Sequence, residues 1–348
     1  MNLKLLAREL NLSISTVSKA LRDSHEISSK TKLAVQAKAK QLNYQPNPFA
    51  SSLRKQKSKT IAVVVPDVAN NFFALAINGI ESIAQEKGYN VLIFLTHEDP
   101  QKEIAITRLL QNGRVDGIMI SLSGETSDIS HLRELIEKEI PLVFFDRVAD
   151  QIKSPKITTD DYNCGKKATQ HLIENGCKKI AFLSIYEKLS TTNKRSSGYL
   201  DALKDNGIKQ NSKLMLSFNG DEEKINDLTR KLLKSKNRPD GIFASVERLA
   251  LSCYEICGEL SIKIPEDIKI ISFSNMPMAA LLNPSLSTIT QPAFEIGREA
   301  ADILFKLVEK RGHNFLLEKT ILKSHLVERH STWGNLKPKT KVEKVRNS

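Results

Sequence analysis

Seven short runs rich in branched and aromatic residues recur between positions 60 and 275, and helix-length stretches separate them. The runs are TIAVVVP, NVLIFL, GIMISL, PLVFFD, KIAFLS, GIFAS and IKIISFS. Stretches such as NFFALAINGIESIAQEKG and CGKKATQHLIENG lie between them. Strands that alternate with helices are typical of α/β folds, so this part of the chain is predicted to build parallel sheets.

A chain of 348 residues is too long to fold around one small core and should divide into two or three compact units. No apolar run approaches the roughly 20 residues of a membrane span, and the N-terminus lacks the apolar stretch of a signal peptide. We therefore expect a cytoplasmic protein with no membrane partner.

Motifs for catalysis and metal binding are missing from the sequence. The cysteines, Cys164, Cys177, Cys253 and Cys257, form no CxxC pair, so we expect small buried side chains rather than zinc ligands or disulfides. The seven histidines are scattered, and no P-loop, GxSxG or HExxH motif occurs. The sequence predicts no enzyme, no metal and no cofactor.

Positive charge is concentrated at the two ends of the chain. Residues 1–60 hold twelve Lys and Arg against three Asp and Glu, a net charge of +9. The tail from residue 336 carries +4, which leaves −1 for the residues between. A basic head before a nearly neutral body indicates a polyanion partner for the head.

The stretch LNLSISTVSKALRDSHEIS, at positions 10–28, predicts a small two-faced helix. At 100° per residue, one arc holds Ile14, Ser15, Ser18, Lys19 and Arg22, and a separate arc holds Thr16, Val17, Ala20 and Leu21. The second arc is suited to packing. The first arc should face a polar partner.

Two further helices are predicted around this one. LKLLARELN precedes it, joined through residues 11–13 with Ser13 as the cap, and a third helix is expected from about Thr31 to Leu42, capped by Ser28 or Ser29. Two short helices joined by such a turn form a helix-turn-helix, whose second helix enters the DNA major groove. The alternative is an ordinary solvated three-helix unit, but the charge excess favours DNA binding.

The next segment, NYQPNPFASSLRKQKSKT, can form a helix of about two turns from Asn47 to Leu53. So short a helix is unstable alone in water and should form only against DNA or a second copy of the chain. Ala50 and Leu53 lie three residues apart, and a leucine on a basic helix can wedge between base steps in the minor groove. A flexible basic linker is the alternative.

Motifs along nearly the whole chain point to one family. The run LLARELNLSISTVSKALRDSHEISSKTKLAV is followed by LNYQPNPFASSLRKQKSKTIAVVVPD, GYNVLIF, VDGIMI, PLVFFDR, HLIENGCKKIAFL, RSSGYLDAL, RPDGIFA, IPEDIKIISFSN, PSLSTITQP and LVERHST. Together they resemble the lactose/galactose repressor (LacI/GalR) family of bacterial transcription regulators.

This resemblance implies a domain order and a function. We expect a small all-α helix-turn-helix domain over residues 1–45, a hinge helix and linker over 46–59, a two-lobed periplasmic-binding-protein-like (type I) body over 60–331, and a disordered basic tail over 332–348. The body would bind an effector and dimerise. The expected protein is a homodimeric repressor that binds a near-palindromic double-stranded DNA operator. A small molecule between the lobes, a sugar or related metabolite, would control it.

The predicted DNA-binding residues are Ile14, Ser15, Thr16, Ser18, Lys19, Arg22, Asn47, Ala50 and Leu53. The resemblance implies that Ile14, Ser15 and Lys19 read base edges. It also implies that Thr16 and Ser18 hold phosphates and that Leu53 with Ala50 sits in the minor groove. Lys19 can donate to guanine, and Ile14 can touch a thymine methyl. Thr16 lies on the packing arc, so its phosphate contact depends on its place near the helix start.

Ligands of parallel sheets bind at the carboxyl ends of the strands. The predicted ligand-binding residues are Phe72, Phe73, Ser121, Asp146, Arg195, Ser245, Ser274 and Gln291. Ser245 is predicted only from its position after a strand, and Arg195 and Gln291 are predicted only from the resemblance. Both arguments predict the other residues. The phenylalanines could stack on a ring or belong to the core. Arg195 could grip a hydroxyl or an anion, or be a surface arginine.

Several positions depart from the resemblance. Ser245 and Val246 stand where many relatives carry Asn-Asp, and Ser274 replaces an aspartate, so two carboxylates that grip sugar hydroxyls are missing. A DNA-binding regulator whose cleft binds nothing is therefore one alternative. An exported solute-binding protein of the same shape is another, which the basic head disfavours. Asp160 and Asp161 are expected to cap a helix.

Overall fold

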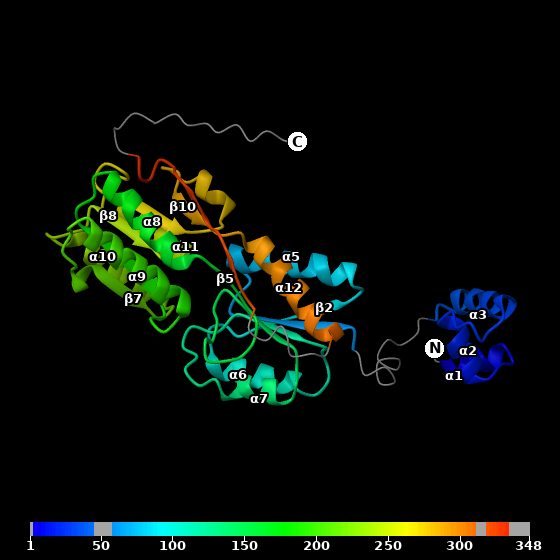
Figure 1. Ribbon diagram of the computed structural model, residues 1–348. Helices are drawn as coiled ribbons and strands as arrows, with labels where there is room; N and C mark the ends of the chain where they lie inside the picture. The colour runs from blue at the N-terminus through cyan, green and yellow to red at the C-terminus, as the bar shows by residue number, and fades with distance from the viewer. Residues whose placement is uncertain (1–2, 45–57, 311–317, 334–348) are drawn as a thin grey trace, which may run out of the picture. The chain divides into compact units, whose positions relative to one another are not determined.

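The computed structural model describes residues 3–44, 58–310 and 318–333, and the chain divides into two compact units, Met1–Ser58 and Lys59–Ser348 (Figure 1). The first unit contains helices α1 (Leu3–Glu9), α2 (Ile14–Leu21) and α3 (Ser29–Gln41). Its core consists of the buried side chains of Leu6, Ala7, Val17, Ala20, Val35 and Ala39.

The helix ends of this unit follow the sequence. Ser13 caps α2 by accepting a hydrogen bond from the backbone N–H of Thr16, and Ser28 caps α3 in the same way from Thr31. Helix α3 begins at Ser29, slightly earlier than predicted, because the cap is Ser28. Both hydroxyls satisfy amide groups that a helix start leaves without partners.

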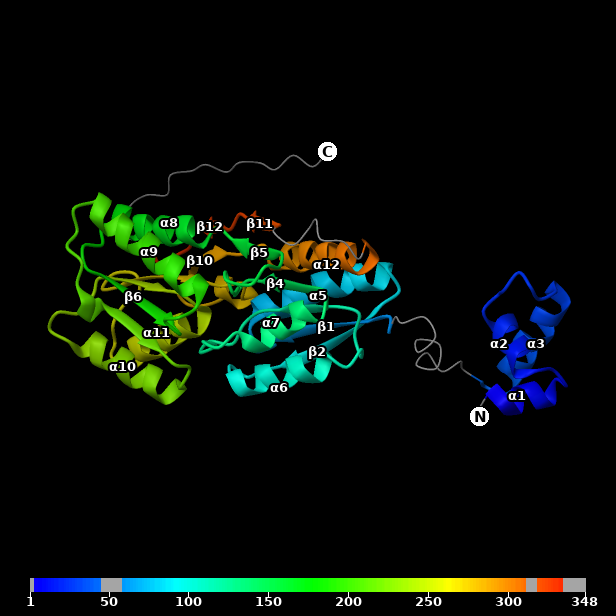
Figure 2. The same cartoon turned by 60° about the horizontal axis from the view of Figure 1, so that its bottom comes forward.

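The second unit contains two lobes, each a six-stranded sheet between two pairs of helices (Figures 1 and 2). The N-terminal lobe has the strand order β11-β5-β4-β3-β1-β2. Its strands are β1 (Thr60–Val65), β2 (Asn90–Leu95), β3 (Ile118–Ile120), β4 (Leu142–Phe145), β5 (Lys156–Thr159) and β11 (Lys319–Leu322). Helices α5 (Asn71–Glu86) and α12 (Ala293–Lys310) cover one face, and α6 (Pro100–Leu110) and α7 (Ser130–Glu137) cover the other.

The C-terminal lobe repeats this plan in the order β12-β10-β9-β8-β6-β7. Its strands are β6 (Ile180–Ile185), β7 (Met215–Phe218), β8 (Gly241–Ala244), β9 (Lys269–Phe273), β10 (Ser287–Thr290) and β12 (His325–Val327). Helices α8 (Asp161–Glu174) and α9 (Ser190–Asp205) lie on one face, with α10 (Glu222–Lys234) and α11 (Glu247–Glu259) on the other. Short 3₁₀ turns, η1 (Ser212–Leu214) and η2 (Pro277–Ala280), complete it.

The chain passes between the lobes three times, after β5, β10 and β11. The pairings within each sheet are parallel except that of β10 with β12. In both lobes the strand order reverses next to the first strand, which is where doubly wound sheets bind ligands. The predicted α/β class with parallel sheets is confirmed.

Five strands are absent from the predicted set, among them β5, whose sequence is KITT. Such runs are too polar or too short to stand out as strands, and their pairing partners are distant in sequence. Lys156 is tolerated inside β5 because its ammonium donates to the carbonyl oxygens of Ile152 and Ser154 at 2.6 and 3.1 Å. The body also runs beyond its predicted end at residue 331. Thr332 is fully buried, with its hydroxyl near Ser287 and His171.

Helices α5 and α12 cross at two glycines. A Cβ on Gly297 would lie 1.9 Å from the carbonyl oxygen of Ala76, and one on Gly79 would lie 2.0 Å from that of Phe294. No side chain fits at such a distance, so the two backbones meet directly. This contact brings α12, which follows the second crossover, back onto the N-terminal lobe.

We expect Gly297→Ala to lower the free energy of unfolding by about 1–3 kcal/mol, because the added methyl group forces the two helices apart. Gly258→Ala is the matched control, since Gly258 is also helical but its Cβ would meet open space. That control should raise stability by up to about 1 kcal/mol through helix propensity. Urea unfolding of the full chain measures both, and equal shifts in the two variants would contradict the crossing argument.

Candidate functional site

Helix α2 presents the predicted polar arc to solvent. Ile14 is 47% exposed, an unusual position for an isoleucine, and Ser15 and Arg22 are exposed as well. Val17 and Ala20 on the other arc are fully buried. The predicted division of α2 into a packing face and a free face is therefore confirmed.

Arg22 and Thr16 make hydrogen bonds to other residues of α2 or of its N-terminal cap. Arg22 donates to the carbonyl oxygen of Ser18 at 3.0 Å and also contacts its hydroxyl. The Thr16 hydroxyl lies 2.8 Å from that of Ser13, at the first turn of α2. Thr16 thus lies near the N-terminal end of α2, where free backbone N–H groups favour the binding of anions.

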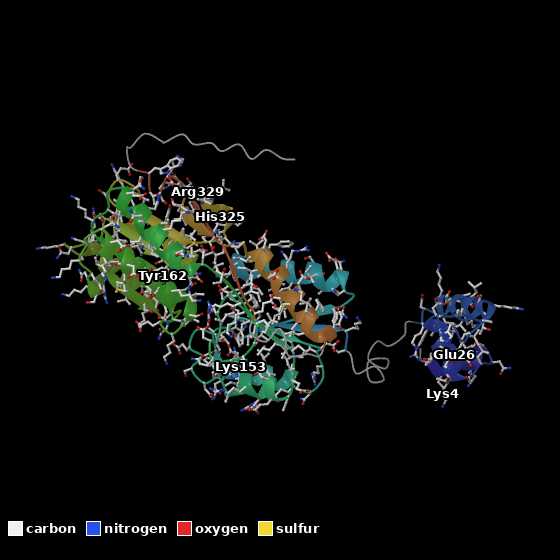
Figure 3. The ribbon with its side chains drawn as sticks, viewed as in Figure 1. Lys4, Glu26, Lys153, Tyr162, His325 and Arg329 are labelled. Carbon is white, nitrogen blue, oxygen red and sulfur yellow. The ribbon has the colours of Figure 1, made fainter. Side chains whose placement is uncertain are left out.

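The acidic residues of the first unit are all neutralised by lysines. The pairs are Glu9 with Lys38 at 3.4 Å, Asp23 with Lys32 at 2.7 Å, and Glu26 with Lys19. Figure 3 labels Glu26 on this unit. The remaining Lys and Arg side chains give the unit its positive charge. Lys19, predicted to read bases, must leave Glu26 to do so.

Three of the predicted DNA-binding residues, Asn47, Ala50 and Leu53, lie outside the described residues. The hinge helix and its minor-groove contact therefore stay predictions.

A cleft lies between the two lobes of the body, with about 500 Å³ of empty space when the open solvent at its mouth is included. Its wall comes from the carboxyl ends of strands in both sheets and from the crossovers. Six of the predicted ligand-binding residues line it, namely Phe72, Phe73, Asp146, Arg195, Ser274 and Gln291. Of these, Phe72, Phe73, Asp146 and Ser274 are expected from their positions after strands, and Arg195 and Gln291 from the resemblance alone.

Ser121 and Ser245 require a correction, because both are fully buried and neither lies on the cleft wall. They support the arginines that do. The carbonyl oxygen of Ser245 accepts a hydrogen bond from Arg195 Nη1 at 2.7 Å, and the Ser121 hydroxyl lies 3.4 Å from the backbone nitrogen of Arg147.

Arg195 is 5% exposed and is therefore not a surface arginine. Its Nε donates to Asp161 Oδ1 at 2.7 Å, and its guanidinium carbon lies 3.7 Å from the centroid of the Phe273 ring. A buried charge requires such partners. The carboxylate, the Ser245 carbonyl and the ring together fix the guanidinium at the cleft.

The expected capping role of the two aspartates is wrong. Asp161 lies inside the first turn of α8 and pairs with Arg195. Asp160 occupies the position before the helix but makes no side-chain cap hydrogen bond. Its Oδ1 instead accepts from the backbone N–H of Ser324 at 2.8 Å and so joins two crossovers.

Asp146 and Arg147 follow β4. Burial raises the pKa of the Asp146 carboxyl to about 6, although Arg147 and Arg195 act in the opposite direction. Arg147 Nε lies 3.9 Å from Asp146 Oδ2, while Nη1 binds both carboxylate oxygens of Glu98 at 2.8 and 3.0 Å. Arg147 is thus closer to Glu98 than to Asp146, which also accepts a hydrogen bond from Gln291.

Glu247 lines the cleft but is absent from the predicted set. Its Oε2 accepts from the Ser274 hydroxyl at 2.7 Å, and its Oε1 accepts from Asn71 Nδ2 at 3.2 Å. Because Asn71 belongs to α5, this carboxylate connects the two lobes. The signal was present in the sequence, since Glu247 stands three residues after the end of β8.

Phe72 and Phe73 belong to the core and to the cleft wall at once. Both are nearly buried in the apolar cluster beneath α5 and α12, and both line the cleft. Their ring centroids lie 5.3 Å apart in an edge-to-face arrangement, a favourable aromatic geometry. The two alternatives for these residues are therefore not exclusive.

Within the described ranges, no group of three or more His, Cys, Asp or Glu is arranged to hold a metal ion. No helix among those residues is long and apolar enough to cross a bilayer. The four cysteines are buried and free, as predicted.

Residues 58–321 match the sequence model described as periplasmic binding proteins and sugar binding domain of the LacI family. Residues 2–47 match bacterial regulatory proteins of the lacI family. The chain belongs to the LacI family. It is a DNA-binding transcription regulator and not an enzyme, as the sequence predicted.

Similar proteins cover most of the chain. The regulator DegA of Bacillus subtilis is 30% identical over 328 residues, which are 94% of this chain and 96% of DegA. A LacI family regulator from Enterococcus faecium, solved with bound ribose, is 27% identical with a TM-score of 0.68 and covers 78% of this chain and 98% of its own. The lac repressor dimer bound to operator and an anti-inducer has a TM-score of 0.84 at 22% identity, covering 96% and 99%, and shows the shared fold.

Asp146→Asn should change how stability depends on pH. The folded chain holds the Asp146 proton up to about pH 6, against an ordinary pKa of 3.8, so this carboxyl destabilises the fold increasingly as pH rises through that interval. The variant should match the wild type near pH 4 and exceed it at pH 8, by at most about 3 kcal/mol. Urea unfolding across this range measures the difference, and a pH-independent difference would contradict it.

Lys19→Ala should weaken binding to the operator by about tenfold or more, and binding to random DNA by much less, because the substitution removes a base contact along with a charge. Lys4→Ala is the charge-matched control, since Lys4 is exposed on α1 and also labelled in Figure 3. That control should reduce binding to both DNAs equally. Fluorescence anisotropy with the two DNAs provides the measurement. If Lys19→Ala weakens binding to the operator and to random DNA equally, Lys19 contacts only a phosphate.

Proposed function

We propose that this protein is a homodimeric repressor that works in the cytoplasm. It binds a near-palindromic operator through one α2 helix in each major-groove half-site. A small molecule in the cleft, a sugar or related metabolite, controls that binding. The bound ribose of the Enterococcus faecium relative and the operator-bound dimer of the lac repressor support this assignment.

The observation that carries the proposal is the joining of two sites in one chain. The first unit offers a polar helix face with excess positive charge, and the body has a cleft walled by both lobes. A ligand that touches both lobes has different affinities for their closed and open arrangements, and only such a difference can shift a conformational equilibrium.

Two contacts between the lobes would have to break for the closed arrangement to open. The hydrogen bond from Asn71 to Glu247 joins α5 to α11, and the Tyr186 ring packs so closely on Gly124 that a Cβ there would lie 2.3 Å from it. Strand β1 begins at Thr60, directly after the predicted linker. Movement of the N-terminal lobe therefore reaches the linker through β1.

The dimer contact is proposed to lie along β2, the edge strand of the N-terminal sheet. Leu92 and Ile93 are 43% and 47% exposed on opposite faces of this strand. An exposed apolar edge strand is a ready site for association. A second copy that covers it would remove this area from water.

Selection of DNA from a random pool by the full-length protein tests the repressor proposal. The expected result is a two-fold symmetric motif, because each copy of a symmetric dimer contacts one half-site. Sequences without any shared motif would refute operator recognition.

Leu92→Asp should shift the protein from dimer to monomer and weaken operator binding by about tenfold or more, because a buried unpaired charge opposes association. Leu109→Asp is the control, since Leu109 is a comparably exposed leucine on α6. Analytical ultracentrifugation measures the oligomeric state. A Leu92→Asp protein that remains dimeric would place the interface elsewhere.

A regulator whose cleft binds nothing is the rival, and one feature favours it. The two arginines of the cleft are already paired, Arg147 with Glu98 and Arg195 with Asp161. A thermal-shift screen with sugars, sugar phosphates and nucleobases separates the two, since a ligand that binds only the folded state raises the Tm. A screen without any shift supports the rival.

A further inference from the structure

The cleft wall carries two carboxylates and two guanidinium groups, and each arginine is also paired with a further carboxylate. Among the described residues, the charged groups on the wall and those paired directly with them are the carboxylates Glu98, Asp146, Asp161 and Glu247 and the guanidinium groups Arg147 and Arg195. The four carboxylates outnumber the two arginines.

Each guanidinium on the cleft wall already has a carboxylate partner. Arg147 lies 2.8 Å from Glu98, and Arg195 lies 2.7 Å from Asp161 and 3.7 Å from the Phe273 ring. A phosphate or carboxylate bound to either guanidinium would compete with these buried carboxylates for its charge. It would also approach the two other carboxylates.

Those two carboxylates, Asp146 and Glu247, lack a close cation. Asp146 forms an ion pair with Arg147 Nε at 3.9 Å, beyond hydrogen-bond distance, and its carboxylate also accepts a hydrogen bond from Gln291. Glu247 receives hydrogen bonds from the neutral donors Ser274 and Asn71 and makes no ion pair within the described residues. The neighbouring Arg248 interacts with the Tyr186 hydroxyl and does not line the cleft.

Burial makes this excess costly. Asp146 is 8% exposed, and its raised pKa reflects the loss of hydration. The positive end of α11 offsets part of the charge of Glu247, which lies in its first turn. A cation between the two carboxylates would interact favourably with both. A neutral ligand offers only hydrogen bonds.

We propose that the effector is a polyhydroxylated ring that carries a protonated amine, held between Asp146 on one lobe and Glu247 on the other. The cleft rejects phosphorylated and carboxylated ligands of the same size. Ser274 and Gln291 line the same wall and can bind ring hydroxyls, and Phe72 supplies an apolar surface. This inference depends on the proposed function of the cleft as an effector site.

Isothermal titration of the full-length protein with two matched series tests it: glucosamine, glucose and glucose 6-phosphate, and galactosamine, galactose and galactose 6-phosphate. In at least one series the amine should bind about tenfold or more tightly than the neutral sugar, since a charge-assisted contact adds that much. The phosphate should be the weakest ligand of each series.

Glu247→Gln keeps the side-chain shape and an acceptor oxygen but removes the charge. It should weaken binding of the amine about tenfold and change binding of the neutral sugar by less than about threefold. Glu255→Gln is the matched control, because Glu255 is exposed on the same helix outside the cleft. Operator binding and an unchanged Tm without ligand establish that the variants fold.

Tighter binding of a neutral or phosphorylated sugar than of its amine would overturn the inference, as would equal effects of Glu247→Gln on amine and neutral sugar. Failure of both amines to bind would overturn it too. The operator selection distinguishes these results from failure of the proposed function: a recovered motif with no amine binding rejects the amine alone.

Discussion

The parallel order of both sheets is the constraint on which the body of this protein depends. Parallel strands place their carboxyl ends at one edge, and in each lobe the order reverses beside the first strand. The three crossovers then bring the two edges together. Asp146 after β4 and Glu247 after β8 belong to different sheets and are 101 positions apart in the sequence, yet they line one cleft.

Buried charge pairs position the arginines of the cleft. Arg195 joins Asp161 of α8, the carbonyl oxygen of Ser245 and the ring of Phe273, which come from three separate elements. Such pairs contribute little net stability because burial costs each ion its hydration. These pairs instead fix the orientation of the side chains at the cleft, because a planar guanidinium group donates hydrogen bonds in set directions.

The DNA-facing unit depends on charge in a different way. Its acidic side chains are each paired with a lysine, so the remaining positive charge is free to attract phosphates. We propose that small residues such as Ser15 and Ser18 let α2 approach base edges closely. On this proposal, affinity for any DNA and selection of one sequence depend on different residues of the same small unit.

The sequence by itself determined the class of fold, the helix-turn-helix and the position of the cleft, because hydrophobic periodicity, caps and strand ends are local properties. Ser13, Ser28, Val17 and Ala20 all lie where such patterns place them. Only the tertiary structure decided which side chains contact one another. That Asp161 pairs with Arg195, that Ser121 and Ser245 lie behind the wall, and that Glu247 connects the lobes all follow from contacts between distant segments. Local patterns do not carry that information, because it arises only when segments distant in the sequence pack together.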